Sequence, residues 1–270
     1  MATLKPIVLL FSVDGMRPDG LQAANTPNMD ALMATGAWTL NAQTVMPSVT
    51  LPCHTSMHRG VDVPRHGITT NTFTPLARPV PGIFDVAHQN QIRTGFFLNW
   101  PELRDLCLPE SLDISVSFGE SHLAEGDRHV AEAAVQFSHD IDFAFIYLGY
   151  TDTCGHETDW MSRYYLAAIS EADRCIGYVR KGLELLGRPI LSLVLSDHGG
   201  HGRSHGTDMP EDMTIPFILH GPGIQSGHQL EGPVRIFDTA PTLAHILKIP
   251  AARQWEGQVI AEAFIHPPNS

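Results

Sequence analysis

The chain has 270 residues, 43% of them apolar, and it carries 17 Lys and Arg against 29 Asp and Glu, a formal net charge of −12 at pH 7. This length fits one large domain with a sizeable core. The acidic balance argues against a general affinity for long polyanions, so we expect no nucleic-acid polymer as a partner. A small anionic substrate stays compatible with this charge, because bound metal ions would invert it locally.

The chain shows no signal for a membrane segment. Its first apolar run, Ile7 to Val13, has seven residues and is interrupted by Ser12, whereas a membrane span needs roughly 18 or more. The four cysteines have no CxxC spacing, which favours reduced thiols in a chain of this size. These features predict a cytoplasmic protein without a membrane partner.

Apolar runs and helical patterns alternate along the chain. Near-continuous apolar runs are typical of buried strands, and apolar residues at three- and four-residue spacing are typical of helices. The predicted strands are Ile7–Val13, Thr94–Leu98, Phe143–Leu148, Ile190–Leu195 and Pro216–Leu219. The predicted helices are Thr26–Gly36, Asp127–Phe137, Trp160–Leu186 and Asp238–Leu247. This order predicts an α/β fold with a mostly parallel central sheet covered on both faces.

The least regular stretches are Thr69–Pro81 and Leu106–Gly126. They contain neither long apolar runs nor a clear helical period, so we interpret them as loops. We therefore predict a single domain over residues 1–270, with a small loop-rich insertion around residues 69–126.

Acidic residues and histidines follow three of the predicted strands directly. Asp14 comes after the first strand, Asp152 and His156 after the strand that ends at Leu148, and Asp197 and His198 after the strand that ends at Leu195. In an open α/β sheet, ligands bind at the carboxyl ends of the strands. These clusters can therefore converge on one site.

Each cluster has an alternative, purely structural interpretation. An Asp after a strand is often a turn former or a helix cap, and Asp152 shares one side with His156 only if that segment is helical. The segment SDHGGHGRSH, from Ser196 to His205, is the strongest signal. Its glycines and serines would leave a poorly packed loop unless a metal organises it, and imidazole with carboxylate suits Zn, Mn or Fe. The alternative is a solvated His-rich loop.

Two prolines, Pro47 and Pro52, bracket Thr50 in MPSVTLPCHTSMHRG. This pattern predicts a fixed turn that leads into a helix starting near Pro52. A hydroxyl at a helix N-terminus lies at the positive end of the helix dipole, which favours an alkoxide and an anionic substrate. Ordinary N-capping by Thr50 is the alternative.

Taken together, these segments resemble the alkaline phosphatase superfamily, most closely its nucleotide pyrophosphatase/phosphodiesterase (type I phosphodiesterase) branch. That branch shows a strand ending in DG, then TPN, P-S/T-x-T-x-P-x-H, HGIxxN, DxxGH and SDHG, and all six occur here in that order. DTAPTLAHIL also looks like the family's closing helix. The matching segments are Val13-Asp14-Gly15, Thr26-Pro27-Asn28, Pro47 to His54, His66 to Asn71, Asp152 to His156 and Ser196 to Gly199.

The resemblance implies a three-layer αβα sandwich with a minimal cap and a site with two divalent metal ions. Its implied nucleophile is Thr50, which would form a phospho-threonine intermediate, and Asn71 would donate to a phosphate oxygen. We expect zinc first and manganese second, from the His-rich ligand set. One metal would be bound by Asp14, Thr50, Asp197 and His198, and the other by Asp152, His156 and a later histidine, for which we prefer His205 to His201.

The expected activity is hydrolysis of small phosphate esters. A neutral Asn71 suits a singly charged diester better than a dianionic monoester, although Arg17, Arg59, Arg65 and Arg203 lie in or near the motifs. Cys53 and Val49 stand where relatives often have Asn and Lys, so the preferred substrate does not transfer from them.

Four other functions remain alternatives at this point. Phosphomonoesterase, phosphonate hydrolase and phosphomutase chemistry use similar metal clusters, and a metal-binding protein without turnover would need neither Thr50 nor Asn71. A sulfatase is disfavoured because Thr50 and His54 occupy the places of the convertible Cys or Ser and of the Arg in C-x-P-x-R. The natural substrate and the oligomeric state stay open.

Overall fold

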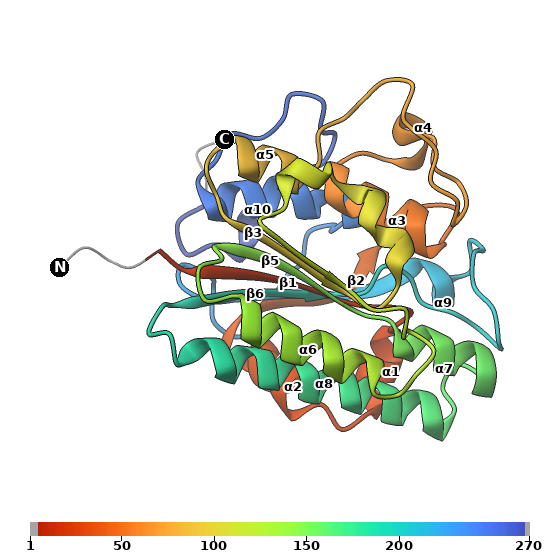
Figure 1. The fold of residues 1–270 in the computed structure, drawn as a ribbon. Coiled ribbons are helices and arrows are strands. Elements are labelled where there is room, and N and C mark those ends of the chain that lie inside the picture. The colour runs from red at the N-terminus through yellow and green to blue at the C-terminus, as the bar shows by residue number, and fades with distance from the viewer. Residues whose placement is uncertain (1–4, 268–270) are drawn as a thin grey trace.

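A computed structural model describes residues 5–267 of the chain. It contains one eight-stranded sheet with the strand order β4-β3-β5-β1-β6-β7-β2-β8. Helices cover both faces of this sheet, which gives the three layers seen edge-on in Figure 1. The α/β sandwich with a mostly parallel sheet is therefore confirmed. The strands are β1 (Ile7–Val13), β2 (Ala37–Gln43), β3 (Thr94–Leu98), β4 (Ile114–Ser117), β5 (Phe143–Leu148), β6 (Ile190–Leu195), β7 (Thr214–His220) and β8 (His228–Gln229).

The strands run parallel from β4 to β6, and β7 is antiparallel to both of its neighbours, β6 and β2. Four of the five predicted strands are observed with the predicted bounds, and the fifth, predicted at 216–219, is longer in the structure, where it forms β7.

The helices are α1 (Pro18–Ala23), α2 (Pro27–Thr35), α3 (Thr50–Arg59), α4 (Val63–His66), α5 (Ile83–Gln89), α6 (Gly126–Phe137), α7 (Tyr150–Thr158), α8 (Arg163–Glu184), α9 (Pro210–Met213) and α10 (Thr239–Leu247).

The central strand β1 is buried along its whole length and divides the core in two. Its Val8 and Leu10 belong to the apolar cluster that packs under α3, α5 and α10, whereas Leu9 and Phe11 belong to the cluster shared with α2, α6 and α8. Because successive side chains of a strand point to opposite faces, one continuous apolar run serves both layers. None of the helices in residues 5–267 is both long enough and apolar enough to span a bilayer.

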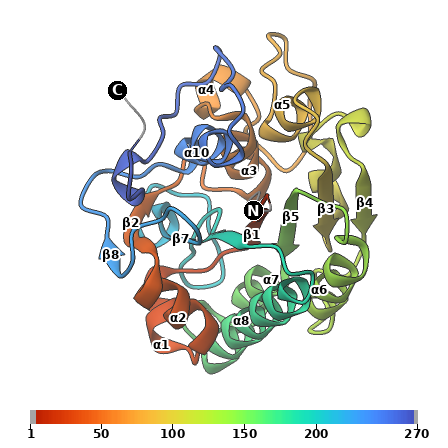
Figure 2. The ribbon, with the colours of Figure 1, turned by 90° about the vertical axis from the view of Figure 1, so that its left-hand side faces the viewer.

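The region around residues 69–126 contains ordered elements as well as loops. Helix α5 lies within it, and strands β3 and β4 from the same region form one edge of the sheet (Figure 2). Residues 67–82 and most of 99–113 form loops, bends and short 3₁₀ turns. The prediction of a single domain with a loop-rich insertion stays a prediction.

The TPN segment joins two helices. The carboxylate of Asp173, fully buried on α8, accepts hydrogen bonds from the backbone N–H groups of Asn28 (3.2 Å) and Met29 (2.7 Å) and from the Asn28 side-chain amide (2.8 Å). Thr26, at the N-cap position of α2, makes no side-chain cap bond. Asp173 therefore caps α2 in place of Thr26, the residue at its N-cap position.

We expect Asp173→Ala to lower the free energy of unfolding by about 2–4 kcal/mol, because it removes a cap and leaves buried N–H groups without a partner. Urea unfolding measures this change. The control is Glu171→Ala on the same helix, whose surface pair with Arg174 contributes little, so about 0.5 kcal/mol or less is expected. Equal effects of the two substitutions would contradict the capping role of Asp173.

Candidate active site

Three neighbouring strands bring three aspartates together. Strand β1 lies between β5 and β6, so the carboxyl ends of all three strands are adjacent. Asp14 directly follows β1, Asp152 lies in the first turn of α7 after β5, and Asp197 follows β6. The loops are tied to each other, because the Asp14 N–H donates to the Leu148 carbonyl (3.0 Å) and the Gly15 N–H donates to Asp197 Oδ1 (3.1 Å). The predicted convergence is present.

His198 stands at the centre of this cluster. Its Nε2 lies 3.3 Å from Asp14 Oδ1, 3.3 Å from Asp197 Oδ2 and 3.2 Å from Thr50 Oγ1. Its Nδ1 lies 2.7 Å from the Gly199 carbonyl, which can only accept, so Nδ1 carries the proton. The Nε2 lone pair therefore faces the two carboxylates and the hydroxyl.

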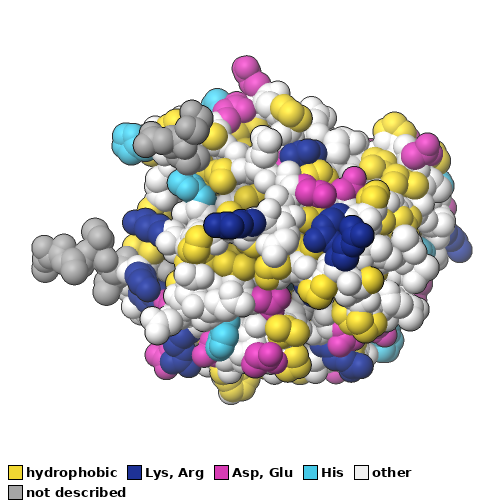
Figure 3. Space-filling model, turned by 90° about the horizontal axis from the view of Figure 1, so that it is seen from above, with side chains coloured by type: hydrophobic (Ala, Val, Ile, Leu, Met, Phe, Trp, Pro, Cys, Tyr) yellow, Lys and Arg dark blue, Asp and Glu magenta, His cyan; other side chains and the backbone are white. Residues whose placement is uncertain are grey.

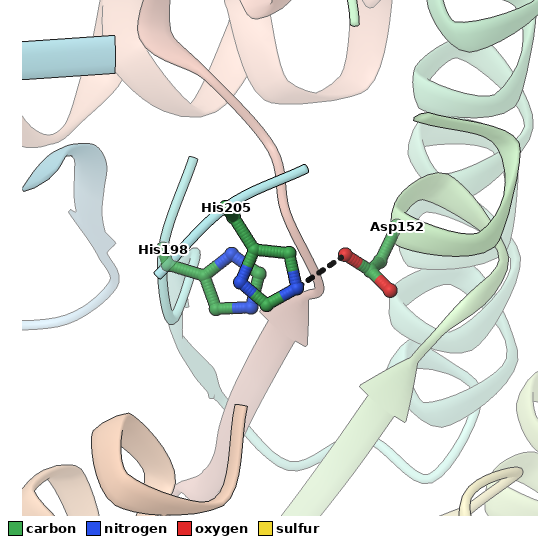
Figure 4. Close-up of side chains that lie close together, drawn as sticks. All are labelled: Asp152, His198 and His205. Atoms are coloured by element: carbon green, nitrogen blue, oxygen red, sulfur yellow. Dashed lines mark ion pairs between the residues drawn. The ribbon is translucent and has the colours of Figure 1, made fainter. Parts of the chain in front are cut away.

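His156 and His205 flank Asp152 in the same manner. His205 Nε2 lies 3.7 Å from Asp152 Oδ1, and His156 Nε2 lies 3.5 Å from Asp152 Oδ2. Both Nδ1 atoms donate to backbone carbonyls, of Ser48 (2.8 Å) and Arg203 (2.9 Å) respectively. Figure 4 shows the His205 ring stacked on His198 and directed at Asp152; the two ring centroids are 3.9 Å apart. A backbone carbonyl that accepts from Nδ1 fixes the tautomer in which Nε2 of a histidine can bind a metal.

His201 points elsewhere. Its Nδ1 lies 2.7 Å from Asp212 Oδ1, and its backbone pairs with Ser204. The structure therefore brings His205 to Asp152 and directs His201 to Asp212.

Asp14 and Asp197 are buried and Asp152 is partly buried, and the hydrogen bonding of all three carboxylates is incomplete. One oxygen of each, Asp14 Oδ1, Asp152 Oδ1 and Asp197 Oδ2, has no hydrogen-bond partner among the described residues. Burial and the charges of Asp197 and Asp152 raise the pKa of Asp14 well above its ordinary value, although the Tyr147 hydroxyl donates to it. Burial also raises the pKa of Asp152 to about 6, against the effect of His205 and His156. The mutual repulsion of these three acids is relieved either by protonation or by a bound cation.

Asp197, His198 and His205 are in the protonation state that metal binding needs. Burial acts to raise the pKa of Asp197, but His198, His54 and the Gly15 N–H more than offset it, so this carboxyl stays ionised. Burial lowers the pKa of His198, and burial with His198 lowers that of His205 to about 4, so both rings are neutral near pH 7.

The donor atoms form two groups that fit metal ions. Within each group the candidate ligand atoms lie within 4.8 Å of one another, and His198 belongs to both. Buried, unpartnered carboxylate oxygens and imidazole Nε2 atoms are suitable donors for a divalent transition metal. The groups are Asp14, Asp197 and His198, and Asp152, His198 and His205.

Thr50 is the first residue of α3, after Val49 in extended conformation. This places its hydroxyl at the helix N-terminus, beside His198. The next residue, Leu51, donates its N–H to Oδ1 of the exposed Asn71 (2.9 Å), and the Asn71 amide N–H₂ makes no hydrogen bond within residues 5–267. The helix begins two residues before the expected start near Pro52.

Comparisons with known proteins agree with this geometry. Residues 8–106 match the family model for type I phosphodiesterase/nucleotide pyrophosphatase, and residues 114–249 match the sulfatase model. Mouse ectonucleotide pyrophosphatase/phosphodiesterase family member 1 is 30% identical over 72% of this chain and 24% of its own length. The chain belongs to the alkaline phosphatase superfamily, in its nucleotide pyrophosphatase/phosphodiesterase-like branch. The resemblance inferred from the motifs is confirmed.

Other relatives show how much of the superfamily fold the chain covers. Mouse family member 7 is 25% identical over 71% of this chain and 49% of its own length, so the chain spans a quarter to a half of these curated relatives. Human ectonucleotide pyrophosphatase/phosphodiesterase 5 has a TM-score of 0.79 at 17% identity, covering 93% of this chain and 97% of that one. The inactive threonine-to-alanine variant of the murine protein, in complex with AMP, has a TM-score of 0.77 at 17% identity, covering 92% of this chain and 96% of that one.

Several residues that support this superfamily site were missed from the sequence. Tyr147, near the end of β5, is buried and donates its hydroxyl to Asp14 Oδ2. Trp160 and Tyr165 both donate to the Gly15 carbonyl, at 3.0 and 2.8 Å. A Tyr in an otherwise apolar buried strand indicates a nearby polar group, since its buried hydroxyl needs a hydrogen-bond partner.

A second buried network holds the start of α7, which carries Asp152 and His156. Asn99 donates its side-chain amide to Asp127 Oδ1 (2.8 Å), and the Tyr150 N–H donates to the same oxygen (3.2 Å). The side-chain oxygen of Asn99, Oδ1, in turn accepts a hydrogen bond from the Gly149 N–H (3.2 Å). Asp127 Oδ2 has no partner among the described residues, and burial raises the pKa of Asp127 to about 6.

This shift predicts a pH-dependent contribution to stability. Folded Asp127 binds its proton more tightly than the unfolded chain does, so its contribution, complete below pH 4, is lost as the pH rises through about 6. Relative to Asp127→Asn, the free energy of unfolding of the unchanged protein should fall by about 1 kcal/mol between pH 5 and 7. Urea unfolding in chelator, at both pH values, measures this; a pH-independent difference would contradict it.

Proposed function

We propose that this protein is a two-metal hydrolase of phosphate esters that acts on diesters through a phospho-threonine intermediate on Thr50. The observation that carries the proposal is the Thr50 hydroxyl, which lies 3.2 Å from His198 Nε2. The same Nε2 lies 3.3 Å from Asp14 Oδ1 and from Asp197 Oδ2, two buried oxygens without a hydrogen-bond partner among the described residues. A nucleophile activated at a helix N-terminus within a metal-ligand cluster is suited to phosphoryl transfer.

We assign the ligands as the motif resemblance implies, with His156 in the second set because its Nε2 lies 3.5 Å from Asp152 Oδ2, although the compact donor group at Asp152 contains His198 and His205. One metal would be held by Asp14, Thr50, Asp197 and His198, and the other by Asp152, His156 and His205. Zinc is the first choice and manganese the second, because neutral imidazole and carboxylate donors suit both. Two divalent ions would favour the Thr50 alkoxide and neutralise charge that develops on the phosphoryl oxygens.

The chain's own residues account for two displacements. In the first, Thr50 Oγ1 forms a bond to phosphorus as the bond to the leaving oxygen breaks, and the leaving alcohol departs with a proton. In the second, water attacks the phospho-threonine, and the products are a phosphate or phosphate monoester and the restored hydroxyl. The Asn71 amide and the Thr50 N–H at the start of α3 would hold a non-bridging oxygen during both steps. One such donor contributes about 10²–10³ in rate.

We propose diesters as substrates because three of the four arginines near the motifs, Arg17, Arg59 and Arg65, are engaged by other groups. Arg17 pairs with Asp19 and donates to the Gly200 carbonyl, and Arg59 is buried, donating to the Val80 and Leu106 carbonyls. Neither guanidinium is available for the second negative charge of a monoester. Arg65 donates to a backbone carbonyl as well, and Arg203 has a side chain that is 64% exposed.

Comparing hydrolysis of bis(p-nitrophenyl) phosphate with that of p-nitrophenyl phosphate tests this preference. We expect the larger kcat/KM on the diester. Faster cleavage of the monoester would overturn the diesterase proposal.

Small nucleotides are the proposed substrate class, in view of the AMP complex of murine ectonucleotide pyrophosphatase/phosphodiesterase 5. A nucleic-acid polymer is not proposed, because the net charge is −12 and the face in Figure 3 carries Lys and Arg side chains scattered among apolar and acidic ones. The cytoplasmic location stays a proposal.

Sulfatase activity is disfavoured although a sulfatase model matches part of the chain. The match covers residues 114–249, which include Asp152 and Asp197 but not the nucleophile segment. Thr50 lies in the part that matches the phosphodiesterase model, and neither a convertible Cys or Ser nor the paired Arg is present there. Phosphonate esters remain the closest alternative, since the phosphonate monoester hydrolase of Silicibacter pomeroyi shares the fold (TM-score 0.75, 17% identity, covering 94% of this chain and 75% of that one).

A further inference from the structure

A cavity of about 640 Å³ lies at the end of the sheet opposite the metal-ligand cluster. Pro6 and Pro189, which precede β1 and β6, contribute to its wall, as does the C-terminal end of α10. Figure 2 looks onto this end of the sheet, with α10 above the start of β1. The cavity is therefore separated from the candidate active site by the length of the central strands.

The cavity is mainly apolar inside. Val8 and Leu191, from β1 and β6, belong to the buried core, while Ile246, Leu247 and Ile249 at the end of α10 are only partly buried. Apolar walls with a few polar groups, in a volume of some hundreds of Å³, are typical of small-molecule sites.

The charged groups of this cavity are unusual for the chain. The sequence contains three lysines, Lys5, Lys181 and Lys248, and two of them, Lys5 and Lys248, border the cavity. The acidic residue of the wall, Asp142, pairs with Arg188 (2.6 Å), which compensates its charge. In a protein of net charge −12, this end of the sheet is thus locally suited to an anion.

We propose that this cavity binds a small amphipathic monoanion, a medium-chain aliphatic carboxylate. The apolar tail would lie against Val8, Leu191 and the end of α10, and the carboxylate would face the two lysines. An aliphatic tail covers the partly buried side chains of α10, and a single negative charge complements the lysines without contacting the metal site. The proposal is independent of the proposed hydrolysis.

Isothermal titration of the full chain with sodium decanoate, in the presence of chelator, tests the proposal. We expect saturable binding at one site, weakened about tenfold or more in the Lys5→Gln/Lys248→Gln double variant and unchanged in Lys181→Gln, the control that removes the third lysine. Uncharged decanol should bind about tenfold more weakly than decanoate.

Three results would overturn the proposal. They are the lack of saturable decanoate binding, equal binding of decanol, and a loss of affinity in Lys181→Gln as large as in the double variant. Both lysines of the cavity are exposed, so their replacement should not unfold the protein, and urea midpoints verify this. Because chelated protein is used, the outcome does not depend on whether phosphate esters are hydrolysed.

Discussion

Thr50→Ala should reduce hydrolysis of bis(p-nitrophenyl) phosphate by a factor on the order of 10³–10⁶ while the fold is retained. The expected loss is large because the hydroxyl is the proposed nucleophile, and residues that form a covalent intermediate have effects of this size. Steady-state kinetics on metal-loaded protein measure the loss, and the urea midpoint monitors folding.

Thr55→Ala is the matched control for this prediction. Thr55 lies on the same helix, is also buried, and donates its hydroxyl to the Leu51 carbonyl (2.7 Å). Its replacement should change kcat by less than about tenfold. Undiminished turnover in Thr50→Ala would refute the nucleophile assignment, whatever the control shows.

Asp14→Asn should change activity and stability in opposite directions. Activity should fall by about 10²-fold or more, because a proposed metal ligand loses its charge. The metal-free protein should become more stable, because one of three buried, mutually repelling carboxylates is replaced by a neutral amide that can still accept the Tyr147 hydroxyl.

Thermal unfolding with and without metal measures both consequences. The unchanged protein should gain stability on metal binding, whereas Asp14→Asn should start from a higher midpoint and gain less. Asp140→Asn, which replaces a carboxylate that is 79% exposed, should behave like the unchanged protein. A metal-free Asp14→Asn protein that is less stable than its parent would show that the carboxylates do not repel one another.

The sequence predicts the centre of this fold better than its edges. Strands β1, β3, β5 and β6 are fully buried, so each apolar run in the sequence begins and ends where its strand does. Strand β2 was missed because its sequence, AWTLNAQ, mixes polar and apolar residues. Strand β4, four residues long at the edge of the sheet, has only alternate half-buried side chains. Such strands depend on tertiary pairing, which leaves a weak local pattern.

The candidate site likewise contains residues that the sequence predicts and residues that only the structure reveals. Asp14, Asp152 and Asp197 follow buried strands, so strand-end reasoning brings them together with the adjacent His156 and His198. The motif resemblance adds Thr50 as the nucleophile. The sequence already favours His205 over His201, but both lie in one loop, and only the fold shows that His205 faces Asp152 and His201 faces Asp212. The structural role of Tyr147, Asn99 and Asp127 depends on contacts between residues 23 to 133 positions apart.

Titration of metal-free protein with zinc, and separately with manganese, while hydrolysis of bis(p-nitrophenyl) phosphate is followed, tests the two-metal hydrolase most directly. We predict no turnover without metal and activity that saturates near two equivalents, with zinc the more effective ion. Full activity in the metal-free protein, or no activity with either ion, would contradict the proposed function.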